Sequence, residues 1–552
     1  MEESKQYPEL VLNSRQLCDI ELILNGGFNP LNGFLNKKDT ESVYENYRLS
    51  NGKLWPIPIN LDILSSNVKN IGDSSNLTLR DYEGNLIAVI DLEDAWSVDK
   101  EREAQQVFGG DSEHPAIQYL KNNVGDVYLG GTLRGYQLPQ HYDYNTIRHT
   151  PQSLREHFRD LGWEPDDSIV AFQTRNPMHR AHVELVKRAA NENNANILIH
   201  PVVGMTKPGD IDYHTRIKCI RTVVNNGDLI KGKCTISALP LAMRMAGPRE
   251  ALWHMLIRKN YGATHFILGR DHAGPGSNSE GKDFYGPYEA RDFGIKHSKE
   301  VGIKTCDFEQ MIYHADKKTY INESDVKPDD INIRKISGTE VRRRLETGED
   351  IPEWFSSPDV IKLLRKTYPP RDKIGICLFF TGFSGSGKST IANALVEKFL
   401  ELNNDRKVTL LDGDHVRHHL SSELGFSREH RDLNIQRIGF VASEIVKHGG
   451  VAICAAIAPY KKARNLARSM VEQHGVFIEI HVNTSIEECE LRDRKGLYNK
   501  ARSGIIKGMT GIDDPYEVPT NPEIKIDTGN GVSKEVQQIF EYLYDDDLVR
   551  RN

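Results

Sequence analysis

The segment GFSGSGKS, residues 382–389, constrains the fold more than any other part of the sequence. It fits the pattern GxxxxGK[ST] and stands between an apolar run, ICLFF, and a helix-forming run, TIANALVEKFL. Its glycines, Gly382, Gly385 and Gly387, allow backbone N–H groups to converge on phosphate oxygens at the start of a helix. A strand, such a loop and a helix form the first unit of a parallel sheet, so this region is predicted to be a nucleotide-binding α/β domain.

The remaining sequence predicts further domains, because 552 residues are too many for one hydrophobic core. Before Ser168, short alternating runs such as NLTLRDYEGNLIAVIDL are typical of β-hairpins. After it, the apolar runs SIVAFQ, NILIHPVV and THFILG alternate with helical runs, of which NPMHRAHVELVKRAANEN is the first. This alternation predicts a second parallel sheet. The predicted division is a β-rich domain (1–167), an α/β domain (168–320), a small helical domain with a linker (321–370) and the second α/β domain (371–552).

Composition excludes several classes of function. With 38% hydrophobic and 27% charged residues the chain is an ordinary globular one, and its net charge of −7 gives no basic field for nucleic acid. No apolar run approaches the ~18 residues of a membrane span, and MEESKQYPELVLNSRQ at the N-terminus lacks the apolar core of a secretory signal. The seven cysteines are dispersed without a CxxC pair, which favours reduced thiols and a cytoplasmic location. Arg342–Arg344 are expected on the solvated face of a helix.

Polar residues near the phosphate loop suggest a transfer reaction. Lys388 would reach the β- and γ-phosphates and Ser389 the Mg²⁺ ion. Asp412 and Asp414 follow the next predicted strand, where two carboxylates can organise Mg²⁺ or accept a proton, although Asp-Gly-Asp is equally compatible with a plain turn. Donors for an anionic acceptor follow at Arg417, Arg431, Asn434 and Arg437.

A second polar segment, QTRNPMHRAH, begins where a predicted strand ends. Gln173, Arg175 and Asn176 offer donors at the carboxyl edge of the sheet, where open α/β folds bind ligands. His179 and His182 are three residues apart, so a helix would place both on one face, where two imidazoles could hold a phosphate chain. The alternatives are half of a metal site, for which HRAH lacks the glutamate of HExxH and a third ligand, or an unremarkable surface.

The late motifs together resemble adenosine 5′-phosphosulfate (APS) kinase. They are GFSGSGKST, DGDHVRHHL, FSREHRDLNIQRIGFVA and KGLYNKARSGIIKGMTGIDDPYEVPTNPE, in about 180 residues from Gly375 to the C-terminus. The resemblance implies a P-loop kinase that transfers the γ-phosphoryl of ATP to the 3′-hydroxyl of APS and forms PAPS. It implies that KGLY…TGIDDPYE closes over both nucleotides, with Lys495 and Lys507 at the substrate. The nucleotide would be held by Gly382, Phe383, Ser384, Gly385, Ser386, Gly387, Lys388, Ser389 and Thr390, Mg²⁺ by Ser389 and Asp412, with Lys388 and Asp414 catalytic.

One residue departs from the kinase pattern. The chain has Ala458-Pro459-Tyr460 where the family often has a serine that has been regarded as a phosphoenzyme intermediate. Phosphoryl transfer depends on positioning and charge neutralisation more than on a covalent intermediate, so direct in-line transfer is expected.

The earlier motifs resemble ATP sulfurylase over roughly residues 1–365. They are QTRNPMHRAH, HPVVGMTKPGD, LPLAMRMAGPREALWHMLIRKNYG and FILGRDHAGPG. The resemblance implies a PUA-like N-terminal domain and a Rossmann-like nucleotidyltransferase domain, in which a sulfate oxygen attacks the α-phosphorus of ATP and pyrophosphate leaves. By motif position, sulfate would be held by Gln173, Arg175 and Ala273, the nucleotide by Gln173, Asn176, Gly269, Arg270, Asp271 and His272, and the reacting groups by Thr174, Arg175, Asn176, His179 and His182.

Both halves would handle APS, so the sequence predicts a bifunctional, multidomain α/β enzyme that makes APS and then PAPS. Its expected partners are ATP, sulfate, APS, PAPS and pyrophosphate, with Mg²⁺ accompanying ATP, no tightly bound organic cofactor, no nucleic acid and no membrane, in a homo-oligomer. Two alternatives remain. The C-terminal domain could be a module that binds PAPS allosterically, or the sulfurylase could run in the ATP-forming direction.

Overall fold

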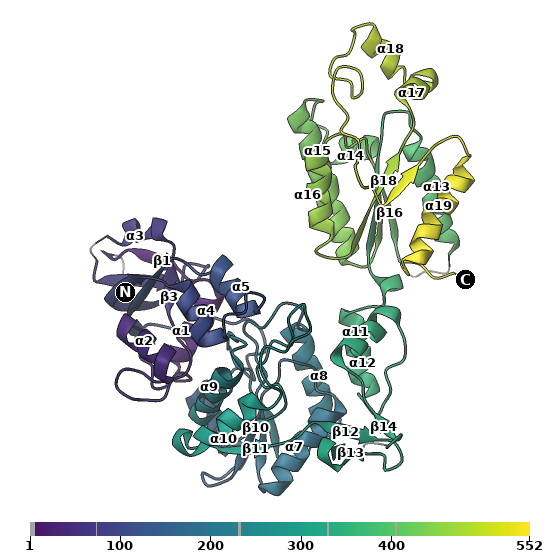
Figure 1. The fold of residues 1–552 in the computed structure, drawn as a ribbon. Coiled ribbons are helices and arrows are strands. Elements are labelled where there is room, and N and C mark those ends of the chain that lie inside the picture. The colour runs from purple at the N-terminus through teal and green to yellow at the C-terminus, as the bar shows by residue number, and fades with distance from the viewer. Residues whose placement is uncertain (1–5, 73, 230–232, 328–329, 403–405, 552) are drawn as a thin grey trace. The chain divides into compact units, whose positions relative to one another are not determined.

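The computed structural model describes residues 6–72, 74–229, 233–327, 330–402 and 406–551, so the first five residues of the acidic N-terminal segment lie outside it. The chain divides into two compact units. Unit 1 comprises Met1–Ser337 and Ile351–Leu364, and unit 2 comprises Gly338–Asp350 and Arg365–Asn552 (Figure 1). Among the described residues, no helix combines the length and the apolar character that crossing a membrane requires.

The N-terminal part of unit 1 contains the predicted sheet. Its strands run in the order β1-β4-β5-β6-β2 with β3 on β6, and the predicted hairpin NLTLRDYEGNLIAVIDL forms the antiparallel pair β4–β5. The strands are β1 (Glu9–Val11), β2 (Gly33–Phe34), β3 (Leu61–Ile63), β4 (Asn76–Arg80), β5 (Leu86–Ser97) and β6 (Val127–Gly135). Helices that the alternating pattern did not predict accompany them: α1 (Ser14–Leu24), α2 (Lys37–Asn46), α3 (Ser65–Ile71), α4 (Lys100–Phe108), α5 (Pro115–Asn122) and α6 (Pro151–Asp160).

The second part of unit 1 is the predicted parallel sheet, in the order β11-β10-β7-β8-β9. The chain order reverses between β7 and β10, so the carboxyl ends of these two strands border the crevice in which Rossmann-like sheets bind ligands. Strands β7, β8 and β10 are buried throughout, as their apolar runs predicted. The strands are β7 (Ile169–Phe172), β8 (Asn196–Ile199), β9 (Cys234–Ile236), β10 (His265–Leu268) and β11 (Lys304–Asp307), and the helices α7 (Arg180–Glu192), α8 (Tyr213–Asn225), α9 (Gly247–Asn260) and α10 (Glu289–Val301).

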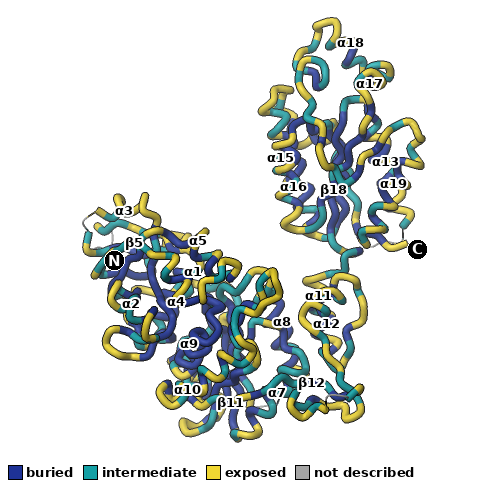
Figure 2. Tube along the Cα trace, in the orientation of Figure 1, coloured by how far each residue is buried: buried dark blue, intermediate teal, exposed yellow. Residues whose placement is uncertain are grey.

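Helix α9 joins the two parts of unit 1 through one continuous core. Nearly all of its residues are buried, as its dark blue trace shows (Figure 2). The ring of Trp253 lies 5.1 Å from that of Phe28, and the guanidinium of Arg249 donates to the carbonyls of Val43 and Pro56. The helix is therefore enclosed by protein, and its buried Arg249 side chain finds partners in these carbonyls of the N-terminal part.

The segment that follows the second sheet belongs partly to unit 1 and partly to unit 2. A small antiparallel sheet has the order β13-β12-β14 and is followed by two helices. These elements are β12 (Met311–His314), β13 (Thr319–Asn322), β14 (Ile333–Arg334), α11 (Gly338–Thr347) and α12 (Pro358–Thr367). The boundaries proposed at residues 320/321 and 370/371 stay predictions.

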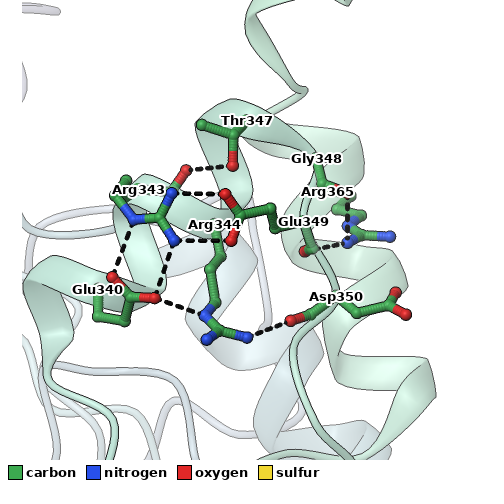
Figure 3. Close-up of polar contacts among 8 residues, drawn as sticks. All are labelled: Glu340, Arg343, Arg344, Thr347, Gly348, Glu349, Asp350 and Arg365. Carbon is green, nitrogen blue, oxygen red and sulfur yellow. Dashed lines mark hydrogen bonds and ion pairs between the residues drawn. The ribbon is translucent and has the colours of Figure 1, made fainter.

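The triple arginine lies on α11, where Arg342 and Arg343 are exposed. Arg343 contacts the carboxylates of Glu340 at 2.9 Å and Glu349 at 2.5 Å (Figure 3). Arg344 contacts Glu340 at 2.7 Å, and these two arginines together lower the pKa of Glu340 to about 2. Through Glu349, Arg343 links α11 to the turn that follows the helix, although exposed ion pairs of this kind add little to the free energy of unfolding.

Unit 2 contains a second parallel sheet, in the order β16-β17-β15-β18-β19. Side chains of β15 alternate between two cores: Leu378 and Phe380 pack with α13 and α19, whereas Phe379 packs with α15 and α16. The strands are β15 (Ile376–Thr381), β16 (Val408–Asp412), β17 (Val451–Ala455), β18 (Val476–Val482) and β19 (Ile524–Ile526). The helices are α13 (Lys388–Glu401), α14 (Gly413–His419), α15 (Arg428–Lys447), α16 (Lys461–Val471), α17 (Ile486–Arg492), α18 (Leu497–Arg502) and α19 (Val532–Asp545).

Candidate active sites

The first polar segment forms an extended turn between β7 and α7. The helix begins at Arg180, four residues later than predicted, because Pro177 disfavours helical backbone at the residue before it. His179 is therefore the N-cap, and the expectation that a helix places both histidines on one face is wrong in this detail. The two rings still stack, with centroids 6.0 Å apart, because Nδ1 of His182 accepts the backbone N–H of His179 at 3.1 Å.

Arg175 links the carboxyl ends of β7 and β10. Its Nη1 lies 2.6 Å from Asp210 Oδ1, and its Nη2 donates to the carbonyl of Gly274 at 3.1 Å. Thr174 is buried and braces the turn by donating to the carbonyl of Asn176 at 2.8 Å, whereas Asn176 itself is exposed. These contacts bring the two predicted polar segments together at the crevice.

Three predicted residues of the turn, Gln173, His179 and His182, are partly withdrawn from solvent. Gln173 is half-buried, and among the described residues its Oε1 has no hydrogen-bond partner. The imidazole of His179 contacts Ser356 at 3.0 Å and packs on Phe355. Burial lowers the pKa of His179 to about 3 and that of His182 to about 4, so both rings are neutral at pH 7 before a ligand binds.

The loop after β10 carries the predicted adenosine-side residues Gly269–His272. Asp271 and Ala273 have left-handed backbone, with φ of 51° and 57°. A Cβ atom at Gly274 would lie 1.8 Å from the Asp271 carboxylate, so the absence of a side chain there lets this carboxylate lie against the backbone. Ala273 is buried, whereas Arg270 is exposed and donates to Gln310 at 2.9 Å. His272 contacts His254 of α9 at 3.1 Å.

The phosphate loop in unit 2 has the backbone that its glycines predicted. Gly382, Gly385 and Gly387 all have positive φ, and Gly387 is the N-cap of α13. Nζ of Lys388 donates to the carbonyls of Gly382 at 3.0 Å and Phe383 at 2.7 Å, inside the loop that would hold phosphates. Burial lowers the pKa of this lysine to about 8, so the amine is mainly protonated at pH 7. The remaining loop residues, Ser384, Ser386 and Thr390, complete the turn into the helix.

The two carboxylates after β16 lie beside the phosphate loop. Ser389 Oγ donates to Asp412 Oδ2 at 2.6 Å, and Asp412 Oδ1 caps α14 by accepting the N–H of Asp414. The exposed carboxylate of Asp414 forms an ion pair with Lys495. Four of the predicted residues, Ser389, Asp412, Asp414 and Lys495, are thus linked from α13, β16, α14 and the segment after α17.

The predicted acceptor-binding arginines contact different segments. The guanidinium of Arg431 contacts Thr510 at 2.7 Å, Asp514 at 2.5 Å and the carbonyl of Gly508. Arg417 donates to the carbonyls of Leu424 and Gly425, and Arg437 donates to Leu420 and pairs with Glu423. Asn434 is buried, and Lys507 is exposed. Within the described residues these contacts do not join Arg417 or Arg437 to the phosphate loop, so their roles stay predictions.

Several residues at these sites were not singled out from the sequence. Tyr460 donates to both oxygens of Asp514, and the buried Arg464 donates to the carbonyl of Ala458 at 2.8 Å and to that of Glu517 at 2.8 Å. In unit 1, Asp210 and Ser356 were missed in the same way. Asp210 lies in the run HPVVGMTKPGD, which resembles the ATP sulfurylase family, so this motif could have identified it as a site residue. The sequence around Ser356 contains no motif that predicts its contact with His179.

Ala458 lies in the turn after β17. It has left-handed backbone with φ of 45° and is 1% exposed. Thr381 Oγ1 and Arg464 both donate to its carbonyl. The side chain at position 458 therefore points into packed protein.

Comparisons with known proteins match every part of the chain. A PUA-like domain model matches residues 1–138, an ATP-sulfurylase model residues 145–367, and an adenylylsulphate kinase model residues 374–527. The sulfate adenylyltransferase of Aspergillus oryzae is 52% identical over 528 residues, which are 95% of this chain and 91% of that protein. That of Chaetomium globosum is 50% identical over 553 residues, 100% of this chain and 95% of the relative. A solved structure, the hexameric APS kinase from Thiobacillus denitrificans, has a TM-score of 0.79 at 34% identity and covers 100% of this chain and 95% of its own.

The chain therefore belongs to the ATP sulfurylase (sulfate adenylyltransferase) family, with an APS kinase domain following the sulfurylase domain. It is a transferase that uses ATP in sulfate activation. The predicted fold class is confirmed: a PUA-like N-terminal domain, a Rossmann-like sulfurylase domain and a P-loop kinase domain.

Proposed function

We propose that the chain makes PAPS from sulfate in two steps. In unit 1 a sulfate oxygen bonds to the α-phosphorus of ATP, the bond to the bridging oxygen breaks, and pyrophosphate leaves with APS as product. In unit 2 the 3′-oxygen of APS bonds to the γ-phosphorus of a second ATP, and ADP leaves. The phosphosulfate anhydride makes the first step uphill, so consumption of APS in the second step draws it forward.

The crevice between β7 and β10 supports the assigned roles in the first step. Gln173, Arg175 and Ala273 would hold sulfate, and Thr174, Arg175 and Asn176 would set it in line with the α-phosphorus. Arg175 is already held by Asp210 and Gly274, so little reorganisation is needed when sulfate binds. A preorganised cationic cradle is what a weak, strongly hydrated nucleophile requires. Gly269–His272, with Gln173 and Asn176, would contact the nucleotide.

His179 and His182 would stabilise the leaving pyrophosphate. Both rings are neutral in the free protein because burial disfavours the charged form. Phosphate oxygens placed beside them favour the charged form, so each ring gains its proton when ATP binds. The positive charge is then present where negative charge develops.

The intact phosphate loop is the observation that carries the kinase proposal. Its backbone, Lys388 and the Ser389–Asp412 pair have the arrangement that a nucleoside triphosphate requires. The Ser389 hydroxyl and the Asp412 carboxylate are hard oxygen donors and suit Mg²⁺, which would neutralise phosphate charge. Asp414 would accept the proton of the 3′-hydroxyl, while Arg417, Arg431, Asn434, Arg437, Lys495 and Lys507 would hold APS.

Transfer would be direct, without a phosphoenzyme. Residue 458 is a buried alanine, so it offers no hydroxyl that could accept a phosphoryl group.

One observation favours a second candidate. The two fungal relatives, at 52% and 50% identity, are named for the adenylyl transfer alone. A C-terminal module that only binds PAPS and regulates unit 1 would fit such a name. The complete loop argues for catalysis, because a purely regulatory site has no need of Lys388 and the Ser389–Asp412 pair together.

The direction of the first step, the cytoplasmic location and the assembly are also proposals. The T. denitrificans protein is named hexameric, which supports a homo-oligomer here. Light scattering on the purified full-length chain measures its molar mass, and a monomer would contradict the proposed oligomer.

The deciding experiment supplies the purified protein with APS, ATP and Mg²⁺ and measures PAPS by chromatography. PAPS formation at catalytic rates is expected. Pyrophosphate release that depends on sulfate, without any PAPS, would overturn the kinase proposal and favour the regulatory module. A failure of both reactions would overturn the two-step function.

A further inference from the structure

A chain of buried polar side chains leads from the middle of α9 to His272 at the sulfurylase crevice. Nε2 of His272 lies 3.1 Å from Nδ1 of His254, and Nε2 of His254 lies 3.2 Å from Oε1 of Glu250. The second contact is a close approach of a ring nitrogen to a carboxylate and not an aligned hydrogen bond. The side chains of Glu250 and His254 are 0% exposed, and neither residue is among those that the resemblance assigns to a substrate.

Glu250 has the contacts of a carboxylate. Its Oε1 accepts the backbone N–H of Arg244 at 3.0 Å, and its Oε2 accepts that of Ala246 at 2.8 Å. Arg244 is itself fixed by Asp19 of the N-terminal part, at 2.6 Å. Burial raises the pKa of Glu250, whereas the two N–H groups and the Arg244 guanidinium oppose that rise. A protonated carboxyl would have to donate from an oxygen that already accepts an N–H group, so the ionised form fits the contacts.

The ionised carboxylate determines where the ring protons lie. A neutral imidazole carries one N–H, and a carboxylate beside Nε2 of His254 places that N–H on Nε2. Nδ1 of His254 is then an acceptor, so Nε2 of His272 must donate to it. This leaves Nδ1 of His272 without a proton, as an acceptor. Burial and the nearby Arg258 guanidinium keep the pKa of both rings well below the ordinary value, so both stay neutral.

We propose that Glu250 and His254 are positioning residues that fix the tautomer of His272, so that its Nδ1 accepts a hydrogen bond from the nucleoside part of ATP. This inference rests on the proposed function, which assigns the Gly269–His272 loop to adenosine. A nitrogen lone pair repels phosphate oxygens and selects a donor. The donors on the nucleoside are the exocyclic amine of adenine and the two ribose hydroxyls. The relay, meaning Glu250, His254 and His272, would present the same acceptor, Nδ1 of His272, to any one of these donors.

The experiment compares ATP with three analogues that each lack one donor: purine riboside triphosphate, 2′-deoxy-ATP and 3′-deoxy-ATP. The full-length chain is measured unmodified and as Glu250→Gln, His254→Phe and Met255→Leu. Met255 is a buried residue of α9 outside the relay, so Met255→Leu is the matched control. Initial rates of sulfate-dependent pyrophosphate release report unit 1 alone and give kcat and KM separately.

We expect one analogue to lose on the order of 10-fold to 100-fold in kcat/KM in the unmodified protein, because a buried acceptor is left unpaired. In His254→Phe this loss shrinks to a few-fold, since the His272 proton is no longer fixed. In Glu250→Gln it also shrinks, because a neutral amide no longer holds the proton of His254 on Nε2 and the proton of His272 is then not fixed. The KM for ATP rises in both variants, and Met255→Leu keeps the full discrimination.

Two results would overturn the relay. One is equal use of all four nucleotides by the unmodified protein, and the other is undiminished discrimination in His254→Phe. If Glu250→Gln does not fold, His254→Phe decides alone. If the unmodified protein releases no pyrophosphate, the proposed function fails first. The relay is then tested by calorimetry, which gives the dissociation constant of each of the four nucleotides for each protein. Every protein also carries Lys388→Ala, so that nucleotide binding at the kinase site is weakened.

Discussion

At the scale of single residues, charge at both sites depends on burial. His179 and His182 have depressed pKa values because their rings are withdrawn from water next to Phe355 and Phe172. A lowered pKa in the folded state means that the unfolded chain binds protons more readily below the ordinary pKa near 6.5. The two histidines therefore cost stability progressively as pH falls from 6.5 towards the folded values of about 4 and about 3.

ATP binding to unit 1 is expected to take up protons near pH 6.5. The free rings are neutral there, and phosphate oxygens beside them raise their pKa. Calorimetry in buffers of different ionisation enthalpy measures this uptake, with Lys388→Ala present to weaken the second nucleotide site. His179→Asn combined with His182→Asn should abolish the uptake. An uptake that survives in this double variant would show that other groups titrate.

Ala458→Ser tests whether a hydroxyl at position 458 takes part in phosphoryl transfer. Because the side chain is buried, the rate of PAPS formation is expected to stay nearly unchanged, and intact-mass spectrometry after incubation with ATP should show no added phosphoryl group. Ala456→Ser, two residues earlier in the same buried turn, is the matched control. A phosphorylated Ala458→Ser protein with faster PAPS formation would argue for the covalent route.

At the scale of elements, glycine sets the spacing of two helices that cover the kinase sheet. A side chain at Gly439 of α15 would lie 2.8 Å from both the Cα and the Cβ of Ala467 on α16. These helices also hold the site, because Arg431 lies on α15 and Arg464 on α16. Their close packing keeps Arg431 opposite Asp514 of the segment that follows α18.

Gly439→Val should destabilise the kinase domain by about 1–3 kcal/mol through overpacking. For a domain of this size each kcal/mol lowers the unfolding midpoint by about 2–4 °C. The measurement is the temperature at which PAPS formation is lost on heating, compared with that for sulfate-dependent pyrophosphate release. Phe440→Val places the same residue on the exposed side of α15 and serves as the control, since Phe440 is 60% exposed. An equal fall in the inactivation temperature of PAPS formation in Gly439→Val and Phe440→Val would refute the packing argument.

At the scale of the whole molecule, the two units have separate cores and separate candidate sites. No side chain of the sulfurylase crevice described above comes from unit 2, and none of the phosphate-loop site comes from unit 1. The segment Ile351–Leu364 belongs to unit 1 and contributes Ser356 to His179, although it follows α11 of unit 2. The chain thus enters unit 2 with α11, returns to unit 1 to complete the first site, and then re-enters unit 2 at Arg365.

Lys388→Ala should separate the two activities. PAPS formation is expected to fall on the order of 100-fold or more, because the phosphate loop loses its cation. Sulfate-dependent pyrophosphate release should stay near the unmodified level, with Lys398→Ala as a control for loss of a lysine on the exposed side of α13. A parallel loss of both activities in Lys388→Ala would mean that the units are coupled in catalysis.

The sequence by itself determined the parallel sheets and the phosphate loop, because these depend on local patterns. Alternation of apolar runs specifies the strands, and the glycines of 382–387 specify the loop wherever the chain lies. The sequence did not determine the helices among the N-terminal strands. The apolar patterns of these helices are weak, and their stability comes from packing on the sheet and on α9.

Only the tertiary structure decided which side chains meet. Ser356 lies 177 residues from His179 in sequence, and Arg244 lies 225 residues from Asp19. The charge state of His179 and the order Glu250–His254–His272 follow from such contacts and from burial. Hydrogen bonding and desolvation act between atoms that only the folded chain brings within a few ångströms, and a local pattern carries no record of them.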